Sequence, residues 1–310
     1  MPKRKVILSC AITGVLATRK QCPAIPYTPE EIALEAKRAY EAGATIAHVH
    51  AREDDGSPSW RMQLFSEIKE RIGAYCPIVV NFSTGGIGNS IEERARPALQ
   101  LKPGIAAVNM GSMNYAIWSR QTKSFHLDTV FQNPFREIEW LIRGLGEVGV
   151  VPELECFDAG HICNADPFIE MGLLHAPMHF SLIMGVCGGI KATRRCLENQ
   201  ISILPDKAQF QVIGIGRQQW ELARWGLELG GHLRVGLEDN FYLRDGVSMA
   251  KSNAELCCDG VRLIEELGCV PTTIEETISS YRTSSVQSFQ ASSHPAAGPR
   301  GLAPDATPRC

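Results

Sequence analysis

The chain lacks several features that would place it in a particular class of protein. No hydrophobic run is long enough to span a bilayer. There is no long basic run either, and Lys+Arg of 31 against Asp+Glu of 34 gives a net charge of −3, which argues against a nucleic-acid or membrane-surface partner. The 11 cysteines show no CxxC spacing, so neither a zinc cluster nor a disulfide framework is indicated. We expect reduced thiols, a cytoplasmic location and small-molecule partners.

The composition is that of a folded globular chain. Hydrophobic residues make up 44% and charged residues 21%, close to globular averages, which leaves enough apolar side chains for a large core. The 310 residues would fill about two average domains, but single α/β barrels of about 250 residues are common. The length therefore permits one large domain.

The first segment permits two interpretations. Lys3, Arg4 and Lys5 precede the apolar run from Val6 to Ala17, an order that is also typical of a secretory signal peptide. The alternative is a buried first strand that ends at Thr13-Gly14. We favour the strand, because the rest of the chain repeats the same pattern.

Short apolar runs alternate along the chain with longer amphipathic stretches, as expected for successive βα units. Eight runs read as strands: Lys5 to Ile12, Thr45 to His50, Pro77 to Phe82, Ile105 to Met110, Val150 to Phe157, His179 to Gly185, Gln209 to Ile215 and His232 to Leu237. Eight is the number that closes a (β/α)₈ TIM barrel, an α/β fold. We predict a single barrel domain over 1–281 and a disordered tail rich in Ser, Ala, Gly and Pro over 282–310.

Capping signals place the helices between these strands. Thr28-Pro29 begins one helix, which ends at Gly43, and Asn133-Pro134 begins another, which ends at Gly149. The other predicted helices are Arg61 to Tyr75, Ser90 to Leu99, Pro167 to Leu174, Lys191 to Leu204, Gln218 to Leu229 and Ala250 to Gly268.

Polar residues are dense where the strands end, and in a parallel barrel the active site lies at that end. The second strand ends in His48-Val49-His50-Ala51-Arg52. Because side chains alternate along a strand, His48 and His50 share one face. Two imidazoles side by side indicate a metal site, and a hydrogen-bonded pair of core histidines is the alternative.

The eighth strand runs into Glu238, Asp239 and Asn240. Strands two and eight both flank strand one in a closed barrel, so they lie roughly 10 Å apart, a gap that His and Glu side chains can span. Two imidazoles and one carboxylate would leave coordination positions open, as catalytic sites require, for zinc, manganese, iron or cobalt. A solvated loop or a helix cap is the alternative for the two acidic residues.

Other strand ends carry weaker signals. The glycine-rich loop from Asn81 to Ser90 could bind a carboxylate or a phosphate, or it could be an ordinary turn. Glu153 and Glu155 share one face of strand five, where either could face the site or pair with a neighbouring strand. Cys187 lacks a visible triad, and Gly214-Ile215-Gly216-Arg217 lacks the third glycine of a dinucleotide fingerprint.

Taken together, Thr13-Gly14, HVHARE with the following Asp-Gly, NFSTGG, GIGR and GGHLRVGLEDN resemble the β-keto acid cleavage enzyme family. The likeness runs from about Val6 to Thr273. The resemblance implies a metal-dependent barrel that moves acyl groups between a β-keto acid and acetyl-CoA, and an oligomer, often a tetramer.

The same resemblance implies roles for individual residues. His48, His50 and Glu238 would hold a zinc ion. Asp239 would be the base that forms the C2 carbanion, with Arg234 orienting it. Ser83 and the Gly85 amide would bind the oxygens of the substrate.

Two positions depart from family members that act on amino-substituted keto acids. Leu16 stands where they carry a glutamate, and Ala107 stands where they carry a threonine on strand four. A pocket lined by Leu16 would prefer an uncharged acyl tail, unless Glu155 points into it and pairs with a cation. The alternatives are a metal-dependent aldolase-type lyase or hydrolase, which CoA dependence would distinguish, and a keto-acid-binding barrel without turnover.

Overall fold

The computed structural model describes residues 2–281, in which eight parallel strands form a closed barrel. The barrel strands are β2 (Leu8–Ala11), β3 (Ile46–Val49), β6 (Val79–Phe82), β7 (Ile105–Asn109), β10 (Val151–Cys156), β11 (His179–Met184), β12 (Gln209–Gly214) and β13 (His232–Val235). They follow one another in chain order, and β13 pairs with β2 to close the barrel. The predicted (β/α)₈ fold is confirmed, and the predicted tail over 282–310 lies outside the described residues.

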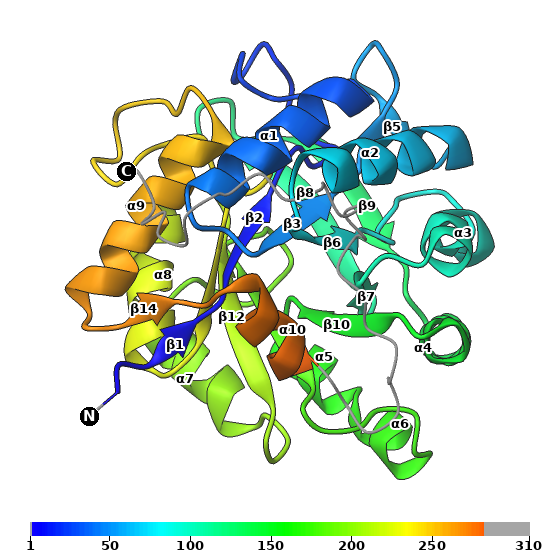
Figure 1. The fold of residues 1–310 in the computed structure, drawn as a ribbon. Coiled ribbons are helices and arrows are strands. Elements are labelled where there is room, and N and C mark those ends of the chain that lie inside the picture. The colour runs from blue at the N-terminus through cyan, green and yellow to red at the C-terminus, as the bar shows by residue number, and fades with distance from the viewer. Residues whose placement is uncertain (1, 282–310) are drawn as a thin grey trace, which may run out of the picture.

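The helices surround the strands (Figure 1). They are α1 (Pro29–Glu41), α2 (Met62–Tyr75), α3 (Ile91–Leu101), α4 (Phe135–Val148), α5 (Ala159–Cys163), α6 (Asp166–Glu170), α7 (Arg194–Ser202), α8 (Gln219–Glu228), α9 (Asn253–Glu266) and α10 (Ile274–Tyr281), and the 3₁₀ turn η1 (Gly216–Gln218) precedes α8. Thr28 and Glu31 form a capping box at the start of α1, and Gly149 ends α4 in the left-handed conformation, as the sequence signals predict.

The first segment is a barrel strand. Ser9 and Cys10 of β2 pair with β13 on one side and with β3 on the other, and every residue of β2 is buried. The strand interpretation of this segment is therefore confirmed over the signal-peptide interpretation. Among the residues that the structure describes, no helix is both long and apolar enough to cross a membrane.

Three regions differ from the sequence prediction. The strand expected over Lys5 to Ile12 is divided into β1 (Lys5–Val6), outside the barrel, and β2. The helix expected over Pro167 to Leu174 is shortened to α6, because Gly172, at φ +69°, turns the chain, and the unexpected α5, capped by the Asp158 side chain, precedes it. An antiparallel hairpin of β8 (Met113–Ser119) and β9 (Ser124–Phe131) stands between β7 and α4, where no element was expected.

The hairpin lies at the carboxyl end of the barrel strands. Ala116 of β8 forms a bridge with Cys187 in the loop after β11. In that loop Gly188 has φ +100°, and a Cβ atom there would lie 1.8 Å from the Asn114 carbonyl oxygen, so only glycine permits this approach.

Two short strand pairs lie outside the barrel and the hairpin: β1 (Lys5–Val6) with β14 (Val270–Pro271), and β4 (Ala51–Arg52) with β5 (Pro58–Ser59).

Alternation along the strands sorts the barrel interior into layers. At the amino end is an apolar layer. The interior contributes Ile7, Ile46, Val79, Ile105 and Val151, and α10 contributes Ile274 and Tyr281. The next inward positions are polar and buried, among them His48, Asn81 and Glu153. The apolar floor closes the amino end, so the polar side chains open toward the carboxyl end.

Candidate metal and substrate site

Two histidines and one glutamate converge at the carboxyl end of the barrel. His48 comes from β3, His50 follows it, and Glu238 lies in the loop after β13. The Nε2 atoms of His48 and His50 lie 3.7 Å and 3.4 Å from Oε1 of Glu238. One ligand atom of each of the three residues lies within 4.8 Å of the others. The structure therefore brings together the three residues singled out as metal ligands.

The chemistry of these donors fits a divalent cation. Burial lowers the pKa of His48 well below its usual value, so its imidazole is neutral and keeps a lone pair for a metal. Burial opposes ionisation of Glu238, but its neighbours, among them His50 and the Arg234 guanidinium, hold its pKa well below its usual range. Oε2 of Glu238 is buried and has no hydrogen-bond partner within the described residues. Such an atom needs a cation or a donor.

The Arg234 side chain forms hydrogen bonds to three acidic side chains at this cluster. Its Nε and Nη2 donate to Oδ2 and Oδ1 of Asp239 at 2.9 Å and 3.1 Å, a bidentate pair. Nη2 also donates to Oε1 of Glu238 at 2.9 Å, and Nη1 to Oε1 of Glu155 at 3.4 Å. One buried guanidinium thus sets the positions of all three acidic groups.

Burial gives two of these carboxyls a pKa in the range useful for proton transfer. It raises the pKa of Asp239 to about 6, although Arg234 opposes the shift. It raises the pKa of Glu155 to about 8, again against the charge of Arg234. A carboxyl with a pKa near neutrality can both take and return a proton.

The loop after β6 contributes the predicted oxygen-binding groups. Ser83 is buried, and its Oγ accepts a hydrogen bond from the Gly85 amide at 3.2 Å. A Cβ atom on Gly85 would lie 3.3 Å from Nδ2 of Asn109. Asn109 pairs in register with Glu155, so this loop and the Arg234 cluster face the same interior.

The remaining predicted residues lie in different environments. Ala107 is fully buried on β7, in register with Glu153. Leu16 lies in the loop between β2 and α1 and is 44% exposed. The Arg52 side chain, at the end of the run that contains both histidines, donates to Thr13 and Gly14 and so supports that loop.

Sequence reasoning missed Tyr115, on the unexpected hairpin. Its ring packs edge-on against Phe131 and Phe157, with centroids 6.1 Å and 6.4 Å away. Burial and the charges of Glu238 and Asp239 raise its pKa to about 12, so a neutral hydroxyl lies near the acidic cluster. Alternating apolar residues in β8 and β9 are a strand signal, but nothing local places Tyr115 beside Asp239.

Comparison with known proteins identifies the family. A sequence model of the beta-keto acid cleavage enzyme family matches residues 5–281. The 3-keto-5-aminohexanoate cleavage enzyme of Acetoanaerobium sticklandii is 41% identical over 266 residues, which is 85% of this chain and 93% of that protein. The 3-oxoadipate:acetyl-CoA acetyltransferase of Cupriavidus necator is 35% identical over 275 residues, 87% of this chain and 92% of that protein.

Solved structures agree on the fold. The apo structure of ObcA matches with a TM-score of 0.69 and 19% identity, over 84% of this chain and 65% of that chain, so it supports the barrel alone. With the family match over nearly all of the described residues, the chain belongs to the beta-keto acid cleavage enzyme family.

Proposed function

We propose that this enzyme exchanges an acyl group between a β-keto acid and acetyl-CoA, giving acetoacetate and a new acyl-CoA. The observation that carries the proposal is the bidentate pair of Arg234 and Asp239 beside the cluster of His48, His50 and Glu238. It offers a positioned proton acceptor next to a set of cation ligands. Two relatives, the 3-oxoadipate:acetyl-CoA acetyltransferase of Cupriavidus necator and the 3,5-dioxohexanoate:acetyl-CoA acetone transferase of Paraburkholderia graminis, are named for transfer that involves acetyl-CoA.

We infer that His48, His50 and Glu238 hold one divalent cation, with zinc as the first choice among metals that take this donor set. When bound, such an ion supplies positive charge for the carboxylate and keto oxygens of the substrate. The unpartnered Oε2 of Glu238 and the neutral His48 support this assignment.

Asp239 takes the proton from C2 of the β-keto acid in this proposal. Arg234 holds both carboxylate oxygens, so the carboxylate cannot rotate away from the substrate. On the loop after β6, the Ser83 hydroxyl donates to a substrate oxygen, and the Gly85 amide exchanges its bond to Oγ of Ser83 for one to the substrate. Positioning of this kind can lower the barrier by several kcal/mol, because two substrates must meet in one pocket.

The proposed bond changes balance. The C2 carbanion forms a bond to the acetyl carbonyl carbon, and the C–S bond of acetyl-CoA breaks to release the CoA thiolate. The thiolate adds to the C3 keto carbon, and the C2–C3 bond then breaks. C2 regains a proton as acetoacetate leaves, and C3 leaves as the thioester of the new acyl-CoA.

For the acyl tail we propose an uncharged or apolar group. Leu16 offers no charge to an ammonium group, whereas an apolar tail that covers its half-exposed side chain gains about 0.8 kcal/mol for each methylene removed from water. Ala107 leaves its position without a hydroxyl. Glu155 would argue against the proposal by pairing with a cationic tail, although its carboxyl already accepts a hydrogen bond from Arg234.

We also propose a cytoplasmic homo-oligomer, with a tetramer as the expected form. Four large apolar side chains on the hairpin are 41% to 54% exposed, namely Ile117, Trp118, Phe125 and Val130. Exposed apolar groups gathered on one element are typical of an association surface.

The test of the proposed reaction is mass spectrometry of CoA thioesters formed from acetyl-CoA and a panel of β-keto acids. We expect new acyl-CoA species and acetoacetate in equal amounts. Cleavage that proceeds without acetyl-CoA would indicate an aldolase-type lyase or a hydrolase instead. Binding of keto acids with no new thioester from any of them would indicate a barrel without turnover.

A further inference from the structure

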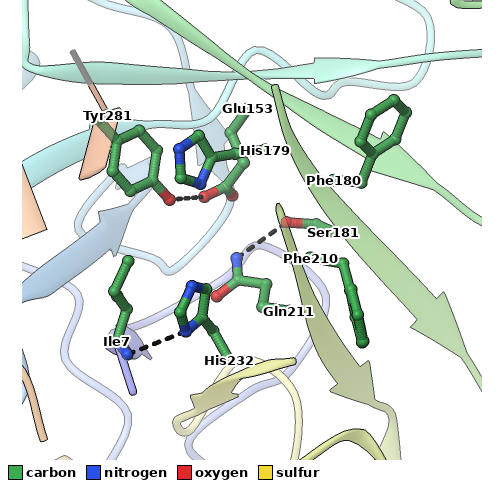
Figure 2. A pocket seen from close by; sticks show the side chains of 9 residues that line it. All are labelled: Ile7, Glu153, His179, Phe180, Ser181, Phe210, Gln211, His232 and Tyr281. Carbon is green, nitrogen blue, oxygen red and sulfur yellow. Dashed lines mark hydrogen bonds between the residues drawn. The ribbon is translucent and has the colours of Figure 1, made fainter. Parts of the chain in front are cut away.

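The last described helix, α10, reaches into the barrel from its amino end. Tyr281 is 3% exposed, and its ring stacks on His179 with centroids 3.6 Å apart and an interplanar angle of 7°. Nε2 of His179 is 3.0 Å from the Ser280 carbonyl oxygen, so the backbone of α10 is held there as well. Figure 2 shows Tyr281 and His179 lining a small internal pocket together with Glu153. The Tyr281 hydroxyl is therefore held at a defined place in the interior.

Each oxygen of Glu153 accepts a hydrogen bond from a different element of the fold. The Tyr281 hydroxyl donates to Oε2 at 3.3 Å, as drawn in Figure 2, and Nδ2 of Asn81 donates to Oε1 at 3.0 Å. Glu153 is 1% exposed, so water does not compete for these bonds. The carboxylate links the C-terminal helix to β6.

Asn81 in turn lies beside a proposed metal ligand. It pairs in register with His48 on the neighbouring strand β3, so the two side chains lie on the same face, inside the barrel. Because Glu153 takes the Asn81 amide nitrogen, the Asn81 oxygen is left to accept a hydrogen bond. That Oδ1 and Nδ1 of His48 are both buried, and neither has a hydrogen-bond partner within the part of the chain that the structure describes.

We propose that Tyr281 is a positioning residue for the metal centre, acting through Glu153 and Asn81 on His48. The Tyr281 hydroxyl and the Asn81 amide donate to Glu153 in the structure. The proposed link is the last one, in which Nδ1–H of His48 pairs with Oδ1 of Asn81 when the metal site is filled, since both atoms are buried and have no other partner within the described residues. The proton on Nδ1 leaves the lone pair on Nε2, the atom that faces Glu238. The inference rests on the proposed metal site and extends it to the opposite end of the barrel.

The test measures the affinity of the metal-free protein for Zn²⁺ by titration against a chromophoric chelator. Tyr281→Phe removes the hydroxyl and keeps the ring on His179. We expect the dissociation constant to rise about 10-fold, the lower end of the range for outer partners of ligating histidines. The absorption spectrum of the Co²⁺-loaded protein should shift as well, because the ligand geometry changes.

Thr277→Val is the matched control on the same helix. Its hydroxyl bonds to Thr45 at 2.9 Å and Thr272 at 2.8 Å, and the substitution leaves the Glu153 contacts in place. We expect it to lower the melting temperature without changing Zn²⁺ affinity or the Co²⁺ spectrum. Equal loss of affinity in both variants would mean that α10 acts through stability alone, and would overturn the proposal.

The outcomes also separate this inference from the proposed function. A wild-type chain that binds Zn²⁺, with Tyr281→Phe binding it equally well, would overturn the positioning role and leave the metal site standing. A wild-type chain that binds no divalent ion would overturn both.

Discussion

The Cγ atom of Glu238 occupies space that a side chain on Gly14 would need. A Cβ atom on Gly14 would lie 2.6 Å from that Cγ, and Gly14 has φ +57°, a conformation that favours glycine. The glycine in the turn after β2 therefore leaves room for the Glu238 side chain, a proposed metal ligand.

Gly14→Ala should therefore weaken metal binding and lower turnover, because Glu238 must move. Gly172→Ala is the control, since Gly172 has a similar φ of +69° and nothing within 4 Å of its Cβ position. Both variants should lose about 1 kcal/mol of stability to backbone strain. Only Gly14→Ala should change Zn²⁺ affinity, and unchanged affinity there would contradict the placement of Glu238 as a ligand.

Metal content gives the most direct check of the cluster. Purified protein should contain about one zinc-like ion per chain, and His48→Ala and Glu238→Ala should each lose it, because two remaining ligands hold a cation weakly. His126→Ala removes an exposed histidine on β9 and should retain the metal. Elemental analysis after dialysis measures the metal content of each protein. A full metal content in both His48→Ala and Glu238→Ala would reject the proposed ligand set.

Asp239→Asn tests the proton transfer. The change is nearly isosteric, so the variant should keep its metal and lose about 10²-fold or more in kcat, the size expected for a general base. Exchange of the substrate's C2 protons with D₂O, followed by NMR, should slow in parallel. Asp245→Asn, in a surface loop where that carboxylate caps Val247 and Ser248, should exchange like wild type. Normal exchange in Asp239→Asn would place the base elsewhere.

Substrate preference tests the role of Leu16. A straight-chain β-keto acid should show a higher kcat/KM than its ω-amino analogue of equal length, because Leu16 offers apolar contact and no charged partner for an ammonium group. A preference for the amino compound would reject the apolar-tail proposal. If Glu155→Gln then abolished that preference, Glu155 would be the partner of the cation.

Stability should fall in mild acid because of His179. Burial lowers its pKa to about 3, whereas an unfolded histidine titrates near 6.5. The unfolded state therefore takes up a proton below pH ~6.5 that the folded state refuses until about pH 3, and the free energy of unfolding decreases over that interval.

Urea unfolding at pH 7 and pH 5 measures this effect. His179→Gln cannot titrate, so its loss of stability between the two pH values should be smaller than that of wild type by about 2 kcal/mol. His232, whose pKa burial lowers to about 4, contributes equally in both proteins and cancels in the comparison. Identical pH dependence in the two proteins would show that His179 is protonated or exposed in the folded state.

The alternation of apolar runs and capped amphipathic stretches was enough to predict the eight barrel strands, because each βα unit carries its own periodicity and stop signals. Thr28 and Gly149 are local signals of this kind, and both act as expected. Strand periodicity also placed His48 and His50 on one face, and family resemblance added roles for Glu238, Asp239 and Arg234.

Only the tertiary structure decided the contacts that join distant segments. Barrel closure brings Arg234 to Glu155 and Tyr281 to Glu153, where each pair forms a hydrogen bond. It also places the hairpin residue Tyr115 near the acidic cluster that contains the Arg234–Asp239 pair. Tyr281 and Glu153 are far apart in the chain, and no local pattern records that α10 covers the amino end of the barrel. Periodicity determines which way a side chain faces, whereas its partner is set by the packing of elements remote in sequence.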